Sequence, residues 1–217
     1  VTSMLVGLGT ARVIQLPQVM GVIIGTAIGS TLTVQLISFD LAIYALPLFI
    51  LGFMTYFVAP NKLLIKNIAT VIMGFAMIFL GLKMISISSH YFAELELLTE
   101  VISALKNNPI YSFAAALLFC VFVQSSAVTI GLAMSLCSAG VISSHDAILW
   151  VYGANIGTTS IALFAASSSN YIGKQIAWAH FFYKTLSVLI FYPMTQYMLD
   201  FISPAQDTPA RLIANFH

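Results

Sequence analysis

The segment Phe119-Cys-Val-Phe-Val-Gln-Ser-Ser-Ala-Val-Thr129 places three polar side chains, Gln124-Ser125-Ser126, inside a long apolar stretch. An apolar segment lies on each side of them, at 109–123 and at 128–142. Each segment is too short to cross a bilayer core as a helix, which takes about 20 residues. Two half-length segments that meet at polar residues are typical of a re-entrant helical hairpin whose tip lines a cavity. We therefore predict such a hairpin over 109–142, with a solute site at its tip.

The composition indicates a protein that lies in a lipid bilayer. Of the 217 residues, 60% are hydrophobic and 7% are charged, and the mean hydropathy is +0.99. A soluble domain of this length cannot bury so much apolar surface, so we predict an all-α polytopic membrane protein. The formal net charge of +1 provides no basic excess for binding nucleic acid. Cys120 and Cys137 lie in the apolar segments and are expected to be buried free thiols.

Apolar segments of suitable length predict five membrane-spanning helices besides the hairpin. Pro17 suits the first turn of the first helix, and Pro47 is expected to kink the second. The predicted spans are 16–38, 41–59, 67–87, 145–166 and 176–198. The predicted polar connections are 60–66, 88–108 (an interfacial helix and loop), 167–174 and 200–210.

The charged residues separate between the two sides of this layout. One side receives basic residues and no acid, whereas the other receives all seven acids together with Lys106 and Arg211. Because cytoplasmic loops carry an excess of Lys and Arg, we expect the basic side to be cytoplasmic, in a plasma membrane such as the bacterial inner membrane. The basic side carries Arg12, Lys62, Lys66 and Lys174, and the acids are Asp40, Glu94, Glu96, Glu100, Asp146, Asp200 and Asp207.

The sequence also matches itself after a shift of 128 residues. Gly25-Thr-Ala-Ile-Gly-Ser-Thr31 aligns with Gly153-Ala-Asn-Ile-Gly-Thr-Thr159, and Ala11-Arg-Val-Ile14 aligns with Ala139-Gly-Val-Ile142. Two full spans and one hairpin separate the copies, so the copies are expected to cross the membrane in opposite directions. Inverted repeats with broken helices are typical of secondary transporters.

The shift divides the chain into two predicted repeats, 1–87 and 109–217. The counterpart of the hairpin tip in the first repeat would lie just before Val1, and the second repeat would stop early. We therefore expect the chain to be a fragment with a truncated first hairpin.

The hairpin tip has the chemistry of an anion site. The second segment begins there, so free backbone N–H groups and the positive end of the helix dipole face the tip. Ser125 and Ser126 add neutral donors, and Gln124 adds a donor and an acceptor. Ser and Gln also join membrane helices by simple hydrogen bonds, but their position at a hairpin tip favours a functional interpretation.

Two further groups of polar residues lie within predicted spans. The glycines of 153–159 are typical of close helix packing, whereas the oxygens of Asn155, Thr158 and Thr159 could bind Na⁺ or a substrate hydroxyl. Lys184 lies roughly 15 Å into its span, where an ionisable side chain is functional by default. It can pair with an anionic substrate or occupy the place of a cation. His180 lies one turn earlier and is equally compatible with a structural role.

Enzyme motifs are missing from the sequence. It contains no nucleophile elbow, metal-ligand cluster or P-loop. Ser125 or Ser126 with His180 could formally make a hydrolase, but nothing in their spacing supports one.

The motifs together resemble those of the sodium-dependent phosphate cotransporters of type II and their bacterial relatives. The resemblance rests on Gln124-Ser-Ser, on the later Gly153-Ala-Asn-Ile-Gly-Thr-Thr, and on Ala177-Trp-Ala-His180, which resembles the family's Ala-x-x-His-x-x-Phe-Asn stretch. It covers nearly the whole chain. Ala127 stands where the family has a third serine, and Lys184 stands where it has asparagine.

The resemblance implies transport of inorganic phosphate by alternating access, with Na⁺ as the coupling ion and no other cofactor. It implies that Gln124, Ser125 and Ser126 bind the substrate, and we expect Lys184 to bind it as well. The expected sodium ligands are Thr129, Asn155, Thr158, Thr159, Ser30 and Thr31. From the residues alone, a transporter of another small anion and a non-transporting membrane sensor or scaffold remain alternatives.

Overall fold

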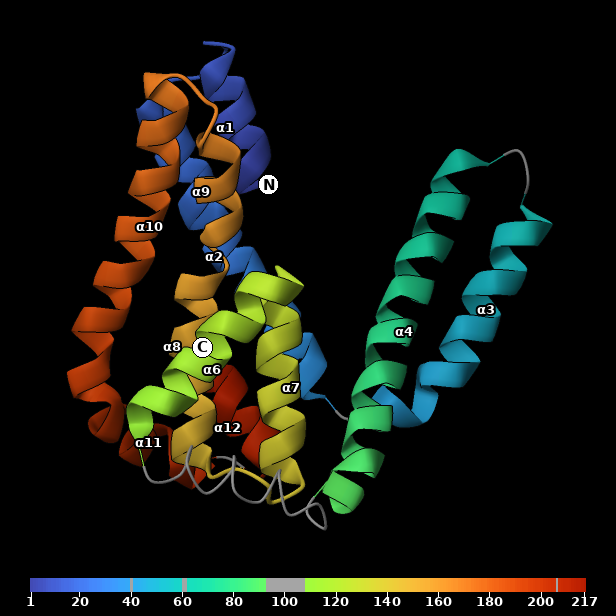
Figure 1. The fold of residues 1–217 in the computed structure, drawn as a ribbon. Coiled ribbons are helices and arrows are strands. Elements are labelled where there is room, and N and C mark those ends of the chain that lie inside the picture. Colours follow the sequence, from blue (N-terminus) through green and yellow to red (C-terminus); the bar gives the residue numbers. More distant parts are fainter. Residues whose placement is uncertain (40, 60–61, 93–107, 206) are drawn as a thin grey trace.

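The computed structural model describes residues 1–39, 41–59, 62–92, 108–205 and 207–217, and this part of the chain is built from helices (Figure 1). The predicted all-α class is confirmed. The α-helices are α1 (Thr2–Thr10), α2 (Leu16–Ser38), α3 (Ala45–Val58), α4 (Leu63–Phe92), α6 (Pro109–Val123), α7 (Ser126–Ser138), α8 (Ser144–Gly157), α9 (Ser160–Ala166), α10 (Tyr171–Phe191), α11 (Thr195–Ile202) and α12 (Pro209–Phe216). Within the described ranges, short 3₁₀ helices lie between some of them, namely η1 (Leu41–Tyr44), η2 (Tyr192–Met194) and η3 (Ser203–Ala205).

Three segments of the described chain are long and apolar enough to cross a bilayer, namely Leu16–Ser38, Leu63–Met84 and Ser144–Ala166. Large apolar side chains also stand exposed along α2, α3, α4 and α10, with Leu32 and Leu189 exposed by 65% and 66%. Such surfaces are stable facing lipid rather than water. The chain is therefore a multi-pass membrane protein, and its spanning segments include three of the five that the sequence predicts.

The predicted span 41–59 is not among these segments, because it is divided between η1 and the 14-residue helix α3. Pro47 is the third residue of α3, directly after the change from η1 to α3. The backbone nitrogen of a residue in the first turn has no partner within the helix, so a proline costs little there. The kink that the sequence predicts at Pro47 stays a prediction.

The predicted span 176–198 is also placed differently, since α10 begins at Tyr171 and ends at Phe191. The side chain of Asn170 accepts a hydrogen bond from the Gly173 nitrogen at 3.1 Å, and this cap starts the helix inside the predicted loop. Lys174, His180 and Lys184 make α10 less apolar than the three candidate spans.

Three more predicted connections are also partly helical. In the connection 60–66, α4 already begins at Leu63. In the interfacial segment 88–108, residues 88–92 continue α4, whereas 93–107 lie outside the described residues. In the connection 200–210, α11 continues to Ile202 and α12 begins at Pro209.

Helix α8 is the centre of the main bundle. It packs against α6, α7, α10 and α12, and most of its residues are buried. The contact with α6 depends on two glycines. A Cβ atom on Gly153 would lie 2.6 Å from the Phe113 carbonyl oxygen, and one on Gly157 would lie 2.7 Å from the Leu117 oxygen. The two backbones therefore approach as closely as small residues allow.

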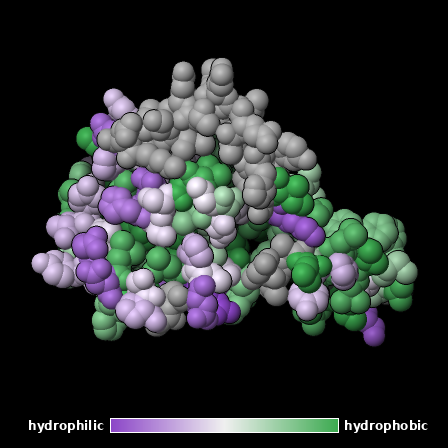
Figure 2. Space-filling model, turned by 90° about the horizontal axis from the view of Figure 1, so that it is seen from below, coloured by the Kyte–Doolittle hydropathy of each residue, from purple (hydrophilic) through white to green (hydrophobic). Residues whose placement is uncertain are grey.

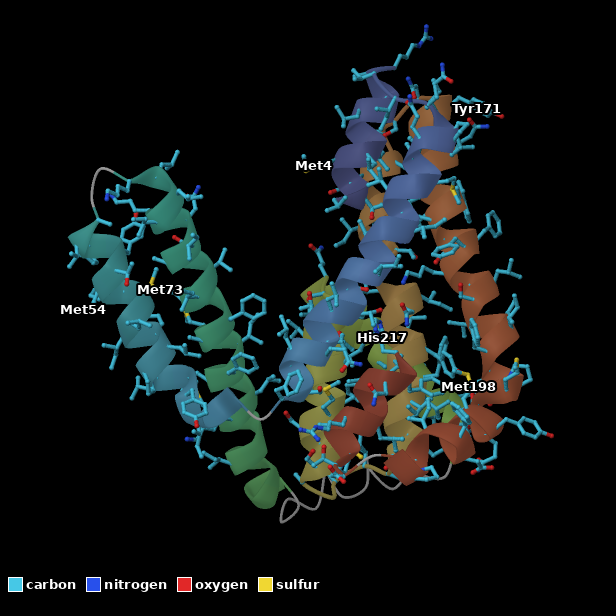
Figure 3. All side chains as sticks on the ribbon, turned by 180° about the vertical axis from the view of Figure 1, so that it is seen from behind. Met4, Met54, Met73, Tyr171, Met198 and His217 are labelled. Carbon is cyan, nitrogen blue, oxygen red and sulfur yellow. The ribbon has the colours of Figure 1, made fainter. Side chains whose placement is uncertain are left out.

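Helices α3 and α4 form a separate pair beside this bundle (Figure 1). They pack on each other where Gly52 faces Met73, which lies between the two helices (Figure 3). The pair meets the bundle through the contact of α4 with α7. Seen from below, hydrophilic residues gather over the bundle, whereas the projecting pair is mostly hydrophobic (Figure 2).

The α1–α2 and α7–α8 turns have the same local structure, 128 residues apart. Arg12 and Gly140 both have positive φ, at 58° and 73°. Their nitrogens donate to the Gly9 and Cys137 oxygens, each at 3.0 Å. A capping box then begins each following helix, at Gln15 and at Ser143. Figure 1 shows the first turn at the upper end of the molecule and the second at the lower end.

Candidate functional site

The polar residues 124–126 interrupt the helix where the sequence predicts. Helix α6 ends at Val123, and Gln124 takes a left-handed conformation with φ 60° and ψ 24°. Its backbone nitrogen donates to the Cys120 oxygen at 2.7 Å, which closes the last turn of α6. Ser125 is extended and caps α7 through its hydroxyl oxygen, which accepts from the Val128 nitrogen at 3.3 Å.

Helices α6 and α7 run to a shared apex and away from it again (Figure 1). Residues 124–126 form this apex, which we call the hairpin tip. Gln124 is exposed there, and Ser125 and Ser126 are half-buried. The tip thus carries two hydroxyls, one carboxamide and the amino-terminal end of the 13-residue helix α7. These groups can donate several hydrogen bonds to one anion without a positively charged side chain.

Helix α8 and the start of α7 support the tip from behind. The Cys120 thiol donates to the Ala154 oxygen at 3.3 Å, and Gly157 lies against Cys120. Thr129 is fully buried, and its hydroxyl donates to the Ser125 oxygen at 2.9 Å. The hydroxyl proton of Thr129 is therefore used at the start of α7.

A second, slighter break lies inside the segment that the sequence predicts as one span at 145–166. Thr158 and Thr159 keep right-handed helical angles there, and Ser144–Ala166 as a whole is long enough to cross a bilayer. Helix α8 ends at Gly157 and α9 begins at Ser160, with Thr158 and Thr159 between them. Thr159 is buried and donates to the Ile156 oxygen at 2.7 Å, whereas Thr158 is half-buried. Because Gly157 touches the last turn of α6, this break lies close to the hairpin tip.

Asn155 points away from the tip. It lies two positions from Gly153, so the two side chains are about 200° apart around α8, and the Gly153 face is covered by α6. The Asn155 carboxamide instead accepts a hydrogen bond from the Lys184 ammonium of α10, with 2.7 Å between Nζ and Oδ1. In the described residues, no hydrogen bond joins this pair to the hairpin tip. The predicted site residues thus fall into two groups.

The second group lines a cavity of about 420 Å³ between α2, α8, α10, α11 and α12. We call this cavity the Lys184 chamber. Thr31 of α2 lines it, whereas its neighbour Ser30 does not; both hydroxyls donate to the Ala27 oxygen, at 3.1 and 2.8 Å. The polar residues of the lining are Thr31, Tyr152, Asn155, Tyr183, Lys184, Ser187, Asn215 and His217.

Asn215 and His217 are chamber residues that the sequence did not predict. They belong to the end of α12, which lies inside the bundle, and Figure 3 shows His217 there. Asn215 accepts from the Gln35 side chain at 2.8 Å, and the Nδ1 atom of His217 has no hydrogen-bond partner among the described residues. The sequence Ile213-Ala-Asn-Phe-His217 is similar to Ile176-Ala-Trp-Ala-His180 in α10, but this similarity does not indicate a shared cavity.

His180 is buried in α10 and is absent from the chamber lining. A larger cavity of about 800 Å³ lies between α4 and α7, and its lining includes Lys83 and Arg211. Within the described chain, that cavity contains none of the predicted site residues.

Known proteins share this sequence over most of its length. The chain is 28% identical to "Uncharacterized protein YqeW" of Bacillus subtilis over 97% of the chain and 68% of that protein. It is 23% identical to "Putative inorganic phosphate export protein YjbB" of Escherichia coli over 100% of the chain and 40% of that protein. A shorter region, 42% of the chain and 14% of the relative, is 32% identical to human "Sodium-dependent phosphate transport protein 2B".

No solved structure matches the chain. The sequence profile described as Na⁺/Pi-cotransporter matches residues 1–87 and 92–200, which is nearly the whole sequence. This is a family of transporters and not of enzymes. The chain belongs to the Na⁺/Pi-cotransporter family.

Proposed function

We propose that the full-length protein moves inorganic phosphate across the plasma membrane by alternating access, with Na⁺ as the coupling ion. The chain spans 68% of the length of YqeW and 40% of the length of YjbB. Membership of the Na⁺/Pi-cotransporter family supports phosphate as the substrate, and so do the names of YjbB and of the human relative.

The observation that carries the proposal is the helix break at Gln124 and Ser125. A break of this kind offers a phosphate ion neutral donors and the positive end of a helix, and the ion can leave again because no fixed charge holds it. In a bilayer, irregular backbone is stable only where it lines a cavity or is buried in protein. We therefore propose that 109–142 is re-entrant and that its tip reaches the transport path.

The hydroxyl oxygens near the tip suit Na⁺, which prefers hard oxygen ligands. Thr129 lies directly behind the tip, and Thr158 and Thr159 lie at the neighbouring break of α8 and α9. We propose that these three threonines contribute to a sodium site beside the bound phosphate.

We also propose that the chain contains two inverted repeats, 1–87 and 109–217. The matching turns at Arg12 and Gly140, with the same bonds 128 residues apart, support this division. The opposite ends at which the two turns lie in Figure 1 support the inversion. Inverted repeats allow the two halves of a transporter to exchange conformations, which is the basis of alternating access.

The ends of the helices support the predicted orientation. Arg12 lies in the α1–α2 turn, Lys62 precedes α4, and Lys174 lies in the first turn of α10. The three connections that hold these basic residues lie toward the upper end in Figure 1. Helices α8 and α12 begin at the opposite, lower end, directly after Ser143 and Thr208. We propose that the upper end faces the cytoplasm.

Phosphate flux in proteoliposomes tests the site. Ser125→Ala should raise the KM for radiolabelled phosphate about 10- to 100-fold, because a hydrogen bond to an anion is worth roughly 1.5–3 kcal/mol. Ser125→Thr keeps the hydroxyl and should stay close to wild type. Ser143→Ala is the matched control, since Ser143 caps α8 in the same way but lies at the far end of α7.

Three results would count against the proposal. Wild-type flux in Ser125→Ala would remove the assigned site, and phosphate binding without flux in the wild type would indicate a sensor. Flux of another anion that phosphate fails to compete with would change the substrate. A flux that is unaffected by an imposed Na⁺ gradient would remove Na⁺ as the coupling ion.

A further inference from the structure

The Lys184 ammonium is held in the Lys184 chamber by a carboxamide and not by an acid. Asn155 Nδ2 donates to the Val151 oxygen at 3.1 Å, so its Oδ1 atom points toward the chamber. Lys184 Nζ donates to that atom at 2.7 Å. The ammonium therefore occupies the position from which a cation would be bound by the Asn155 oxygen.

The chamber provides no negative charge to balance this ammonium. Among the described residues that line the chamber, Lys184 is the one lysine or arginine, and none is Asp or Glu. The other oxygens there belong to neutral groups such as Thr31 and Ser187. A second cation bound at Asn155 would be repelled by Lys184 over a few ångströms, without a carboxylate to offset the repulsion.

We infer that the Lys184 ammonium takes the place of one coupling sodium ion at the Asn155 oxygen. This inference rests on the proposed function, because it concerns the ions that accompany phosphate. Na⁺ and an ammonium group carry the same charge and both bind amide oxygens. The tethered ammonium, however, remains with the protein through the cycle and carries no net cation across the membrane. Each transported phosphate is therefore accompanied by one sodium ion fewer than in a variant without Lys184.

The inference differs in its consequences from a direct contact between Lys184 and phosphate. If Lys184 binds phosphate, its removal weakens phosphate binding and leaves the number of sodium ions unchanged. If Lys184 replaces a sodium ion, its removal opens the Asn155 oxygen to Na⁺, and the number of sodium ions per phosphate rises.

The test is the ratio of radiolabelled sodium to radiolabelled phosphate moved by the full-length protein in proteoliposomes. Lys184→Asn should raise this ratio by one sodium ion and make phosphate flux depend more steeply on the Na⁺ concentration. Lys184→Met, which keeps the length of the side chain, should do the same and serves if the asparagine variant does not fold. Lys184→Arg keeps the charge and should keep the wild-type ratio. Lys83→Asn removes an exposed lysine of α4 and is the matched control.

An unchanged ratio in an active Lys184→Asn or Lys184→Met variant would overturn the inference and leave the proposed function intact. An equal rise of the sodium-to-phosphate ratio in Lys83→Asn would also overturn the inference and leave the proposed function intact. Failure of the wild type to move phosphate would instead overturn the proposed function, and the inference with it.

Discussion

Gly157 of α8 lies directly against Cys120 of α6, so that a Cβ atom on the glycine would stand 2.7 Å from the cysteine Cβ. Gly153, one turn earlier, meets Ala116 in the same way at 2.8 Å. The corresponding glycines of α2, Gly25 and Gly29, would place a Cβ atom in open space, with nothing within 4 Å. One sequence pattern therefore has two different environments in the same molecule.

This contrast predicts opposite effects of alanine at matched positions. Gly157→Ala should lower the free energy of unfolding by about 1–3 kcal/mol, because two backbones must separate to admit the methyl group. Gly29→Ala should be neutral or stabilise by up to about 1 kcal/mol, since alanine favours the helix. Thermal unfolding in detergent measures both changes. Equal melting temperatures for the two variants would show that the α6–α8 contact is not as close as described.

Gln124 and Arg12 have nearly the same φ, 60° and 58°. Glycine variants at the two positions therefore distinguish an effect on protein stability from an effect on substrate binding at the tip. Glycine adopts this conformation without strain, so Gln124→Gly and Arg12→Gly should each stabilise the protein or leave its stability unchanged, by up to about 1 kcal/mol. Only Gln124→Gly removes a proposed substrate ligand. We expect it to abolish phosphate flux in a folded protein, whereas Arg12→Gly keeps substantial flux. A Gln124→Gly variant with wild-type KM would show that the carboxamide does not contact the substrate.

Asn170 joins the start of α10 to the end of α1. Its Nδ2 atom donates to the Thr10 oxygen at 2.8 Å, and its Oδ1 atom caps α10. Asn170→Ala should destabilise the protein by about 1–2 kcal/mol, because it loses the cap and the long-range bond. Ser167→Ala is the control, since the exposed Ser167 hydroxyl bonds only within α9, to the Phe164 oxygen at 2.8 Å. A thermal shift in Ser167→Ala as large as that in Asn170→Ala would contradict the predicted role.

The two cysteines should resist modification in the folded protein. Both are free and buried, as the sequence predicts, with exposed fractions of 0% for Cys120 and 7% for Cys137. A maleimide dye should therefore react only as the helices unfold, and its fluorescence should follow the same melting curve as other probes. The variant Ser167→Cys introduces an exposed thiol that should react at once. Rapid labelling of the wild type below its melting temperature would show that α6 or α7 opens readily.

The sequence predicts the position of the helix break between α6 and α7 because the signal is local. Three polar residues between two short apolar segments leave few alternatives, and Ser125 is a strong cap for the following helix. The break at Thr158 and Thr159 was not predicted, since a 23-residue apolar segment is usually one helix. Threonine hydroxyls that bond to carbonyl oxygens of the preceding turn, as Thr159 does to Ile156, favour such breaks only in a suitable tertiary context.

The partner of Asn155 could not be predicted for a different reason. Which neighbour faces a given side chain depends on how each helix is rotated and on which helix packs beside it. Here the two glycines turn one face of α8 toward α6, and this rotation sends Asn155 toward α10 and Lys184. Such rotation depends on the whole bundle, and no single segment encodes it.

The glycine face of α2 has room for a close neighbour. In the described chain, a Cβ atom on Gly21, Gly25 or Gly29 would meet nothing within 4 Å, whereas Gly153 and Gly157 of α8 are covered by α6. Because small residues let two helix backbones approach closely, a helix could pack on α2 as tightly as α6 packs on α8.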